Sequence, residues 1–298
     1  MLHRNDIYWK GILEDLFADF LRYFYPAAEE LFDISRGFEF LDKELEQLFP
    51  SDDPEHPKFV DKLVKVFTKE GQEEWILVHI EVQGYKDDNF ALRMFTYFYR
   101  IRDRYDKEVI SIAIFTDSDN KFLPDEYTYA GRDGSTSVVF KFKTYKVIDQ
   151  DPAALEANEN PFATVILTVQ LAIRKKNLTT DDFLNLTLDI VRQLYRKGFD
   201  RKKIDNLLVF IRAYANFGKP EINAKFDQAI DELNKKTRTM GIREQVLQVR
   251  AQEATRETKS VIVKNLILKT NHSLQEIADL AEVRINFVLE VKKALESE

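Results

Sequence analysis

Two carboxylates and a carboxamide are spaced so that they could act together in phosphate chemistry. Glu81 and Gln83 end the alternating stretch WILVHIEVQ, and side chains two residues apart project from the same face of a strand. Asp61 begins a second alternating stretch, DKLVKVF. Two carboxylates that meet at a strand end repel each other unless a cation lies between them. Oxygen ligands favour Mg²⁺ or Mn²⁺, which polarises phosphoryl oxygens and acidifies bound water.

This pairing depends on the turn between the two stretches. If the letters KEG form a three-residue loop with a left-handed glycine, Thr68 pairs with Gln72. Asp61 then lies opposite His79 and diagonal to Glu81, on one face of a hairpin. A two-residue loop would place Asp61 on the other face. His79 fits a hydrogen-bonded histidine at the core edge better than a metal ligand.

The elements around this hairpin predict a mixed α/β or α+β core with helices on a central sheet. An amphipathic helix is expected from about residue 6 to 25, and an acidic, proline-containing loop in FLDKELEQLFPSDDPEHPKF. After the hairpin, Asp88 is expected to cap a helix that runs to about Tyr105. The stretches VISIAIFTD and STSVVFKFKTYKVID read as two further strands.

From about residue 160 the pattern is helical throughout. Residues 1–150 are therefore predicted to form the α/β core that carries the candidate site, and residues 151–298 a helical region with a tail at about 255–298. The tail, HSLQEIADLAEVRINFVLEVKKAL, is typical of a short helix-turn-helix that breaks near Glu282, with Arg284 and Asn286 at the start of its second helix. Ser273 or His272 is expected to cap its first helix. Such a hairpin could read DNA, and packing against its own protein or a partner is the alternative use. The expected helices are 161–175, 180–197, 201–216, 221–236 and 241–268.

Composition narrows the function classes. The chain of 298 residues has no cysteine, which excludes thiolate nucleophiles and disulfides and favours a cytoplasmic setting. Its four histidines lack metal-ligand spacing, so a zinc hydrolase is not expected. No apolar run is long enough for a membrane span. The net charge is −7, and the first 60 residues carry 14 acidic and 6 basic side chains, which argues mildly against avid non-specific duplex binding.

A family resemblance rests on the same residues. Asp61, nineteen intervening residues and the run Glu81-Val82-Gln83 resemble the signature of the PD-(D/E)XK nucleases, with glutamine in place of the usual lysine. The stretches VDKLVKVF, ILVHIEVQGY and FALRMFTYFYRIRDRY resemble the Rpn family of recombination-promoting nucleases, also described as YhgA-like transposases. The resemblance covers roughly residues 6–150 and continues loosely into the helical half.

The resemblance implies a restriction-endonuclease-like core that cuts DNA with Mg²⁺ and leaves 5′-phosphate and 3′-hydroxyl ends. Carried over by position, Asp61 and Glu81 would bind the metal and Gln83 would take the place of the lysine. A carboxamide cannot supply the charge of a lysine, and Lys65 or Lys62 is a candidate substitute. An acid from another element often completes such sites; Glu14 is the choice by placement, and Glu44 competes with it.

The helix after the hairpin offers a second set of candidates, which would contact DNA. Counted from Arg93, the side chains at i, i+4, i+7 and i+11 form one stripe along the helix. Three of the four are arginines, and guanidinium groups suit phosphate oxygens. A solvated face is the equal alternative, because several aspartates flank it. The opposite stripe, Phe90, Met94, Phe98 and Ile101, is predicted to be core. The DNA-binding candidates are Arg93, Tyr97, Arg100 and Arg104.

Two functions therefore follow from the sequence. The first is a metal-dependent DNA endonuclease, with a homodimer as a possible state because nucleases that cut both strands often work as dimers. The second is a weakly active or inactive nuclease fold that binds nucleic acid or a protein, favoured by Gln83 and by the acidic first 60 residues.

Overall fold

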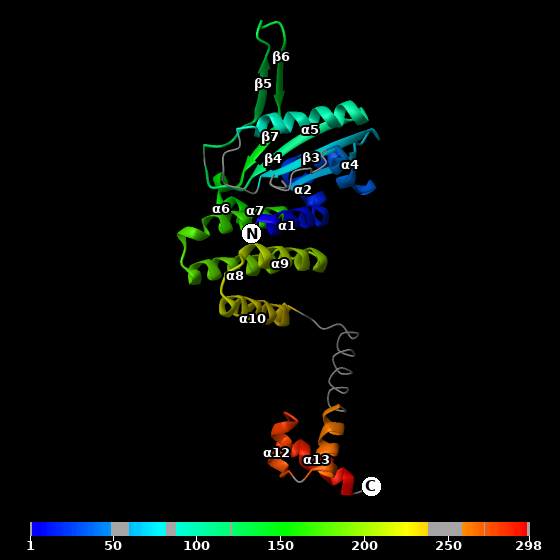
Figure 1. The fold of residues 1–298 in the computed structure, drawn as a ribbon, viewed down its shortest axis with the longest axis vertical. Coiled ribbons are helices and arrows are strands. Elements are labelled where there is room, and N and C mark those ends of the chain that lie inside the picture. Colours follow the sequence, from blue (N-terminus) through cyan, green and yellow to red (C-terminus); the bar gives the residue numbers. More distant parts are fainter. Residues whose placement is uncertain are drawn as a thin grey trace. The chain divides into compact units, whose positions relative to one another are not determined.

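The structure is a computed structural model that describes residues 2–48, 60–81, 88–119, 121–237, 258–270 and 272–296. The chain divides into two compact units, residues 1–235 and 236–298. The first unit contains a five-stranded mixed sheet between helices, and the described part of the second is helical (Figure 1). The expected mixed α/β class and the helical C-terminal region are confirmed.

The sheet has the strand order β1-β2-β3-β4-β7. Strand β2 pairs antiparallel with β1 and β3, whereas β3, β4 and β7 run parallel. The stretch predicted as one strand over STSVVFKFKTYKVID divides at Phe142 into β6 and β7, and β6 leaves the sheet to pair with the unpredicted β5. The strands are β1 (Glu39–Phe40), β2 (Val60–Phe67), β3 (Glu73–Glu81), β4 (Glu108–Phe115), β5 (Glu126–Ala130), β6 (Ser137–Lys141) and β7 (Lys143–Lys146).

The N-terminal helix expected at about 6–25 is interrupted. Helix α1 (Leu2–Asp15) ends before Leu16, whose backbone leaves the helical region at φ −121° and ψ 26°, and α2 (Phe17–Phe24) follows. The interruption lets both helices bury their apolar sides, because Leu13, Leu16 and Phe17 are all almost fully buried. Both helices cover the face of the sheet that carries Val64 and Val66.

The expectation of a loop in FLDKELEQLF is wrong, because α4 (Asp42–Leu48) is helical. Leu41, Leu45 and Leu48 recur at helical spacing and pack on Leu63 of the sheet. Acidic residues in the first turn, Asp42 among them, favour a helix N-terminus at this point. Shorter elements precede α4: α3 (Ala28–Leu31) and a 3₁₀ turn, η1 (Ile34–Arg36). Residues 49–59 lie outside the described ranges.

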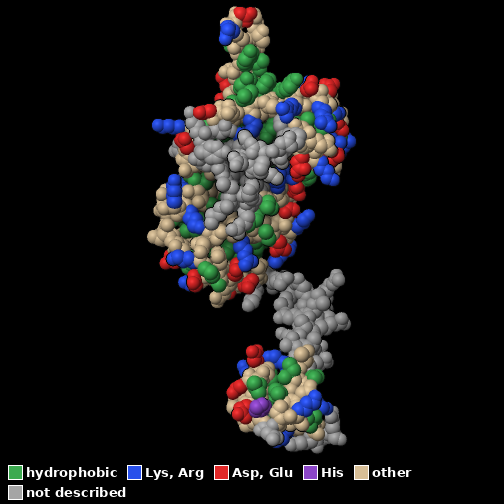
Figure 2. All heavy atoms as spheres, viewed as in Figure 1, with side chains coloured by type: hydrophobic (Ala, Val, Ile, Leu, Met, Phe, Trp, Pro, Cys, Tyr) green, Lys and Arg blue, Asp and Glu red, His purple; other side chains and the backbone are tan. Residues whose placement is uncertain are grey.

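Helix α5 (Phe90–Tyr105) covers the opposite face of the sheet (Figure 1). Its N-cap is Asn89 rather than the predicted Asp88, and it ends where expected. Phe90, Met94 and Ile101 are fully buried, which confirms most of the predicted core stripe. On its outer side, aromatic rings of α5 contact the β5–β6 ribbon, and hydrophobic side chains gather there (Figure 2).

The helices after the sheet belong to the first unit. Trp9 of α1 packs against Phe162 of α7 and Phe210 of α9 in one hydrophobic core, so the boundary predicted at residue 150 falls inside this unit. Among the helices of the described ranges, none combines the length and apolar composition of a membrane span. After a second 3₁₀ turn, η2 (Val147–Asp149), the elements are α6 (Pro152–Ala157), α7 (Pro161–Arg174), η3 (Lys175–Asn177), α8 (Thr180–Arg196), α9 (Arg201–Ala215) and α10 (Pro220–Thr237).

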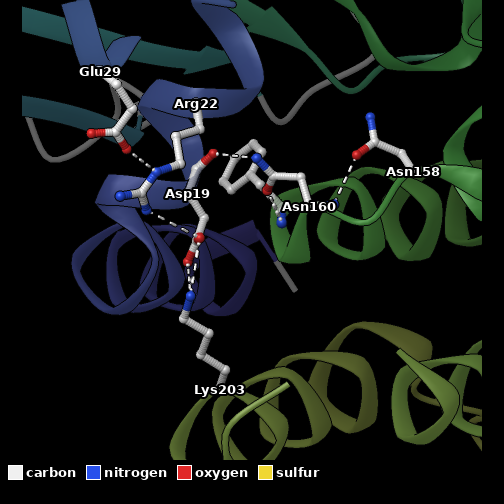
Figure 3. Close-up of polar contacts among 7 residues, drawn as sticks. Asp19, Arg22, Glu29, Asn158, Asn160 and Lys203 are labelled. Carbon is white, nitrogen blue, oxygen red and sulfur yellow. Dashed lines mark hydrogen bonds and ion pairs between the residues drawn. The ribbon is translucent and has the colours of Figure 1, made fainter. Parts of the chain in front are cut away.

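A polar junction ties α2 to α7 and α9. Asp19 is 5% exposed, and its carboxylate lies 2.9 Å from Lys203 Nζ and 3.7 Å from Arg22 Nη1 (Figure 3). The side-chain amide of Asn160 donates to the Asp19 carbonyl at 2.9 Å while its oxygen caps α7. Because each of these partners is supplied within the protein, the junction holds helices together rather than forming an open site.

The second unit contains a helix over residues 258–269, α12 (Leu274–Leu280) and α13 (Ile285–Glu296). The break predicted near Glu282 is confirmed, since this residue adopts φ 50°. Ser273 caps α12 in a reciprocal capping box with Glu276. The predicted two-helix tail is therefore correct, and serine rather than histidine supplies its cap.

Candidate functional site

The turn on which the candidate site depends has the predicted geometry. Gly71 lies in the left-handed region at φ 83°, and the Thr68 amide donates to the Gln72 carbonyl at 2.9 Å. The hairpin register then places Asp61 opposite His79. The backbone positions of Asp61 and Glu81 therefore have the same parity across β2 and β3, as expected for a three-residue loop.

These positions belong to the face of the sheet that α5 covers. Leu63 and Trp75 share their parity and are buried against Tyr97 and Ile101 of α5. Strand β4 lies next to β3, and its residue Phe115 is the register partner of Glu81. The Phe115 ring packs against Phe90 of α5, on the face of the sheet that α5 covers. The backbone of the candidate site thus lies where β2 begins and where β3 and β4 end.

The structure gives backbone positions for Asp61, His79 and Glu81. Their side chains, and the whole of Gln83, lie outside what it describes. Among the described side chains, no group of three or more histidine, aspartate and glutamate residues could hold a metal ion. The side chains of the two predicted ligands are not among them. The fit to a metal therefore rests on backbone register and donor chemistry, and two carboxylates at adjoining strand ends suit Mg²⁺ or Mn²⁺.

The same sheet edge holds a buried ion pair that the sequence did not reveal. Lys146 of β7 aligns with Phe115, and its ammonium group donates to both carboxylate oxygens of Asp117 at 2.7 Å. It also donates to the Phe122 carbonyl at 3.2 Å. The two charged side chains are 2% and 1% exposed. An aspartate two residues after a buried strand was the available sequence signal for this pair.

Glu14, the candidate third acid of the site, forms an ion pair with a buried lysine of β2. Lys62 is fully buried and forms ion pairs with Glu14 of α1 and Asp42 of α4. Adjacent residues of a strand project from opposite faces of the sheet. Because Lys62 follows Asp61 directly, the Lys62 cluster lies on the other side of β2 from the position of Asp61. The two ion pairs of Lys62 therefore connect α1, α4 and β2. The competing candidate, Glu44, is half-buried on α4.

Lys65, the other candidate substitute for the missing lysine, is engaged with acids at the far end of β2. Its ammonium group lies 2.6 Å from Glu39 and 3.4 Å from Glu73. The hydrogen bond to Glu39 is the largest cause of a raised pKa for Lys65. Lys65 is four residues from Asp61, about 13 Å along an extended strand.

The stripe of α5 divides into different environments. Tyr97 is 8% exposed and packs in the core with Leu63, while Arg100 Nη1 donates to the Leu48 carbonyl at 2.8 Å. Arg93 is half-buried beside the Phe90 ring, and Arg104 lies over the Tyr105 ring. Of the four residues, Tyr97 thus packs in the core, whereas the three arginines carry partly exposed guanidinium groups.

Comparison with known proteins gave no relative for this chain. No protein-family model matches it, and searches of curated proteins and of solved structures found no match either.

Proposed function

We propose that this protein is a metal-dependent DNA endonuclease with a PD-(D/E)XK-type core. The observation that supports the proposal is the register of β2 and β3, which puts Asp61 opposite His79 and gives it the parity of Glu81. The mixed sheet between helices is compatible with a restriction-endonuclease-like arrangement. The resemblance to the Rpn family supplies the substrate class, DNA, and the cysteine-free sequence supports a cytoplasmic setting.

In this proposal Asp61 and Glu81 would hold Mg²⁺ or Mn²⁺, which would supply Lewis-acid polarisation and a more acidic water. Gln83 orients that water or contacts the phosphate. The attacking water releases one proton to solvent as its oxygen bonds to phosphorus, the bond to the 3′ oxygen breaks, and the departing oxygen takes up a proton from solvent. The products are 5′-phosphate and 3′-hydroxyl ends. Because one site cuts one strand at a time, a homodimer would let two sites cut both strands together.

Plasmid cleavage tests the proposal directly. Asp61→Asn and Glu81→Gln keep the side-chain volume but remove the charge that binds a cation. We expect each to lower the Mg²⁺-dependent cleavage rate at least about 100-fold, because a metal contributes several kcal/mol to transition-state stabilisation. Glu70→Gln, in the exposed hairpin turn, is the matched control and should cleave like the natural protein. Cleavage that persists in EDTA, or in both variants, contradicts the proposal.

A second candidate function is a nuclease fold without useful activity that binds nucleic acid or a protein. It is favoured by the ion pairs of three described lysines of the sheet, because Lys62, Lys65 and Lys146 are all paired with carboxylates. None of the three therefore offers an uncompensated charge to replace the missing lysine. Calorimetry with Mn²⁺ separates the candidates: absence of binding heat, together with intact DNA binding, selects the second.

A further inference from the structure

The C-terminal unit is built as a compact helix-turn-helix. Helix α12 ends at Leu280 with Ala281 as its C-cap, Glu282 turns the chain at φ 50°, and the Val283 amide donates to the Ala278 carbonyl at 2.9 Å. Helix α13 begins two residues later, at Ile285. The turn is therefore short and has a defined conformation, which fixes the direction in which α13 leaves it.

The two helices share a core with the helix before them. Ile277 and Ala278 of α12, and Val288 of α13, are essentially fully buried. They contact Val263 of the 258–269 helix in one hydrophobic cluster. Lys259 of that helix donates to the Glu282 carbonyl at 2.8 Å and so supports the turn. The 258–269 helix and α12 thus hold α13 as a rigid element rather than as a free peptide.

The outward side of α13 carries side chains that can read base pairs. Arg284, just before the helix, and Asn286, in its first turn, are exposed. Leu289 follows one turn later and is 46% exposed. Exposed Lys293 continues the stripe one further turn along. Arginine pairs with guanine, asparagine with adenine, and apolar side chains contact the thymine methyl group in the major groove.

We propose that α13 reads the sequence of duplex DNA from the major groove. In a helix-turn-helix, the N-terminal residues of the second helix contact base edges while the first helix crosses the backbone. Arg284 and Asn286 occupy that N-terminal position. The exposed Leu280 would also suit a protein partner, but the positions that this motif presents to DNA carry base-reading side chains. The proposal is independent of the nuclease site, because it concerns binding without metal.

Selection from a random duplex pool tests this proposal. The full chain carrying Asp61→Asn and Glu81→Gln is used in EDTA at physiological salt, so that binding is measured without cleavage. We expect one enriched sequence, and fluorescence anisotropy should show that it binds at least tenfold more tightly than a scrambled duplex. Arg284→Ala and Asn286→Ala should each weaken that binding roughly 5- to 150-fold, the cost of losing one base-reading contact.

Asn265→Ala provides the matched control, because Asn265 is an exposed asparagine on the preceding helix. It should bind the selected sequence like the parent chain, and circular dichroism should give equal melting temperatures for all variants. A pool that yields no enriched sequence overturns the proposal, as does enrichment that survives the Arg284→Ala/Asn286→Ala double variant. Self-association of the chain without any DNA binding also overturns it. A positive selection beside failed plasmid cleavage would reject the nuclease proposal alone.

Discussion

At the scale of single residues, the sheet edge near the candidate site is held by a buried charge pair. Lys146 and Asp117 satisfy each other and the Phe122 carbonyl with almost no exposure to water. Burying two charges is costly, and their attraction offsets that cost only when the geometry is good. Removal of one partner leaves the other charge uncompensated, so the pair is a sensitive point of the fold.

Lys146→Met should therefore lower the free energy of unfolding by about 3–5 kcal/mol, measured by urea denaturation. The double variant Lys146→Met/Asp117→Leu removes both charges and should recover most of that loss. Lys121→Met, at an exposed lysine nearby, should change stability by no more than about 0.5 kcal/mol. Equal losses in the single and double variants would show that the pair has no mutual charge coupling.

Two neighbouring glutamates of β3 are predicted to respond to pH in opposite ways. Burial, followed by the charge of Glu108 directly opposite, raises the pKa of Glu74 above its ordinary value of 4.5. Ionised Glu74 therefore destabilises the fold, and its cost grows as the pH rises through the raised pKa. Glu74→Gln should increase stability at pH 7 by roughly 0.2–1 kcal/mol, and the gain should disappear at about pH 4.

The neighbouring Glu73 provides a comparison within the same strand, because its pKa is shifted in the opposite direction from that of Glu74. A hydrogen bond from Lys107 is the largest cause of its lowered pKa, and the charges of Lys65 and Lys107 add to it. A lowered pKa gives stability that is present above the unfolded value and is lost as the pH falls through the folded value. Glu73→Gln should thus destabilise the protein at pH 7 and matter less in acid. Urea denaturation across pH 4–7 measures both variants, and equal signs would contradict the assignment.

At the scale of elements, the β2–β3 hairpin determines whether Asp61 and Glu81 can act together. Its register follows from the loop after Thr68, where Gly71 adopts φ 83° and its amide donates to the Thr68 carbonyl at 3.0 Å. A slip of one residue would move every side chain of a strand to the other face. The turn is therefore as important to the proposed chemistry as the carboxylates.

Gly71→Ala should cost about 1–2 kcal/mol, because a Cβ is disfavoured in the left-handed region. Gly71→Asn should cost less, since asparagine tolerates this conformation. Gly11→Ala in α1 is the control: it has open space for a Cβ, and alanine is preferred to glycine inside helices. Thermal unfolding measures all three. A Gly71→Ala variant as stable as the natural protein would argue against the left-handed turn.

At the scale of the whole molecule, the sheet and the helices after it form one folding unit. The aromatic core of α1 and α2 is completed by α7 and α9, and the Trp9 indole donates to the Tyr214 hydroxyl at 3.0 Å. The polar junction at Asp19 connects the same helices. A boundary at residue 150 would expose this core to water.

A fragment of residues 1–235 should therefore unfold cooperatively, whereas a fragment of residues 1–150 should not fold. The shorter fragment loses Phe162 and Phe210, against which the buried Trp9 packs. Circular dichroism and urea denaturation of the two fragments measure the difference. A cooperative transition in residues 1–150 would show that the sheet region folds without the helices of the second half.

The sequence by itself determined the local features of this protein. Alternation and the KEG loop predicted the hairpin and the pairing of Asp61 with His79, because strand period and glycine conformation are local properties. Helical spacing and a serine cap predicted the α12–α13 tail for the same reason. The resemblance to a nuclease family, in which Gln83 takes the place of a lysine, also comes from the letters alone and stays a prediction.

Only the tertiary structure decided which distant residues meet. The pairing of Lys62 with Glu14 and Asp42, and of Lys146 with Asp117, depends on how α1, α4, β4 and β7 pack. The helical state of Asp42–Leu48 likewise depends on burying three leucines against the sheet, which outweighs its acidic, loop-like composition. Long-range burial has no local signature, and for that reason the core shared with α7 and α9 was not predicted.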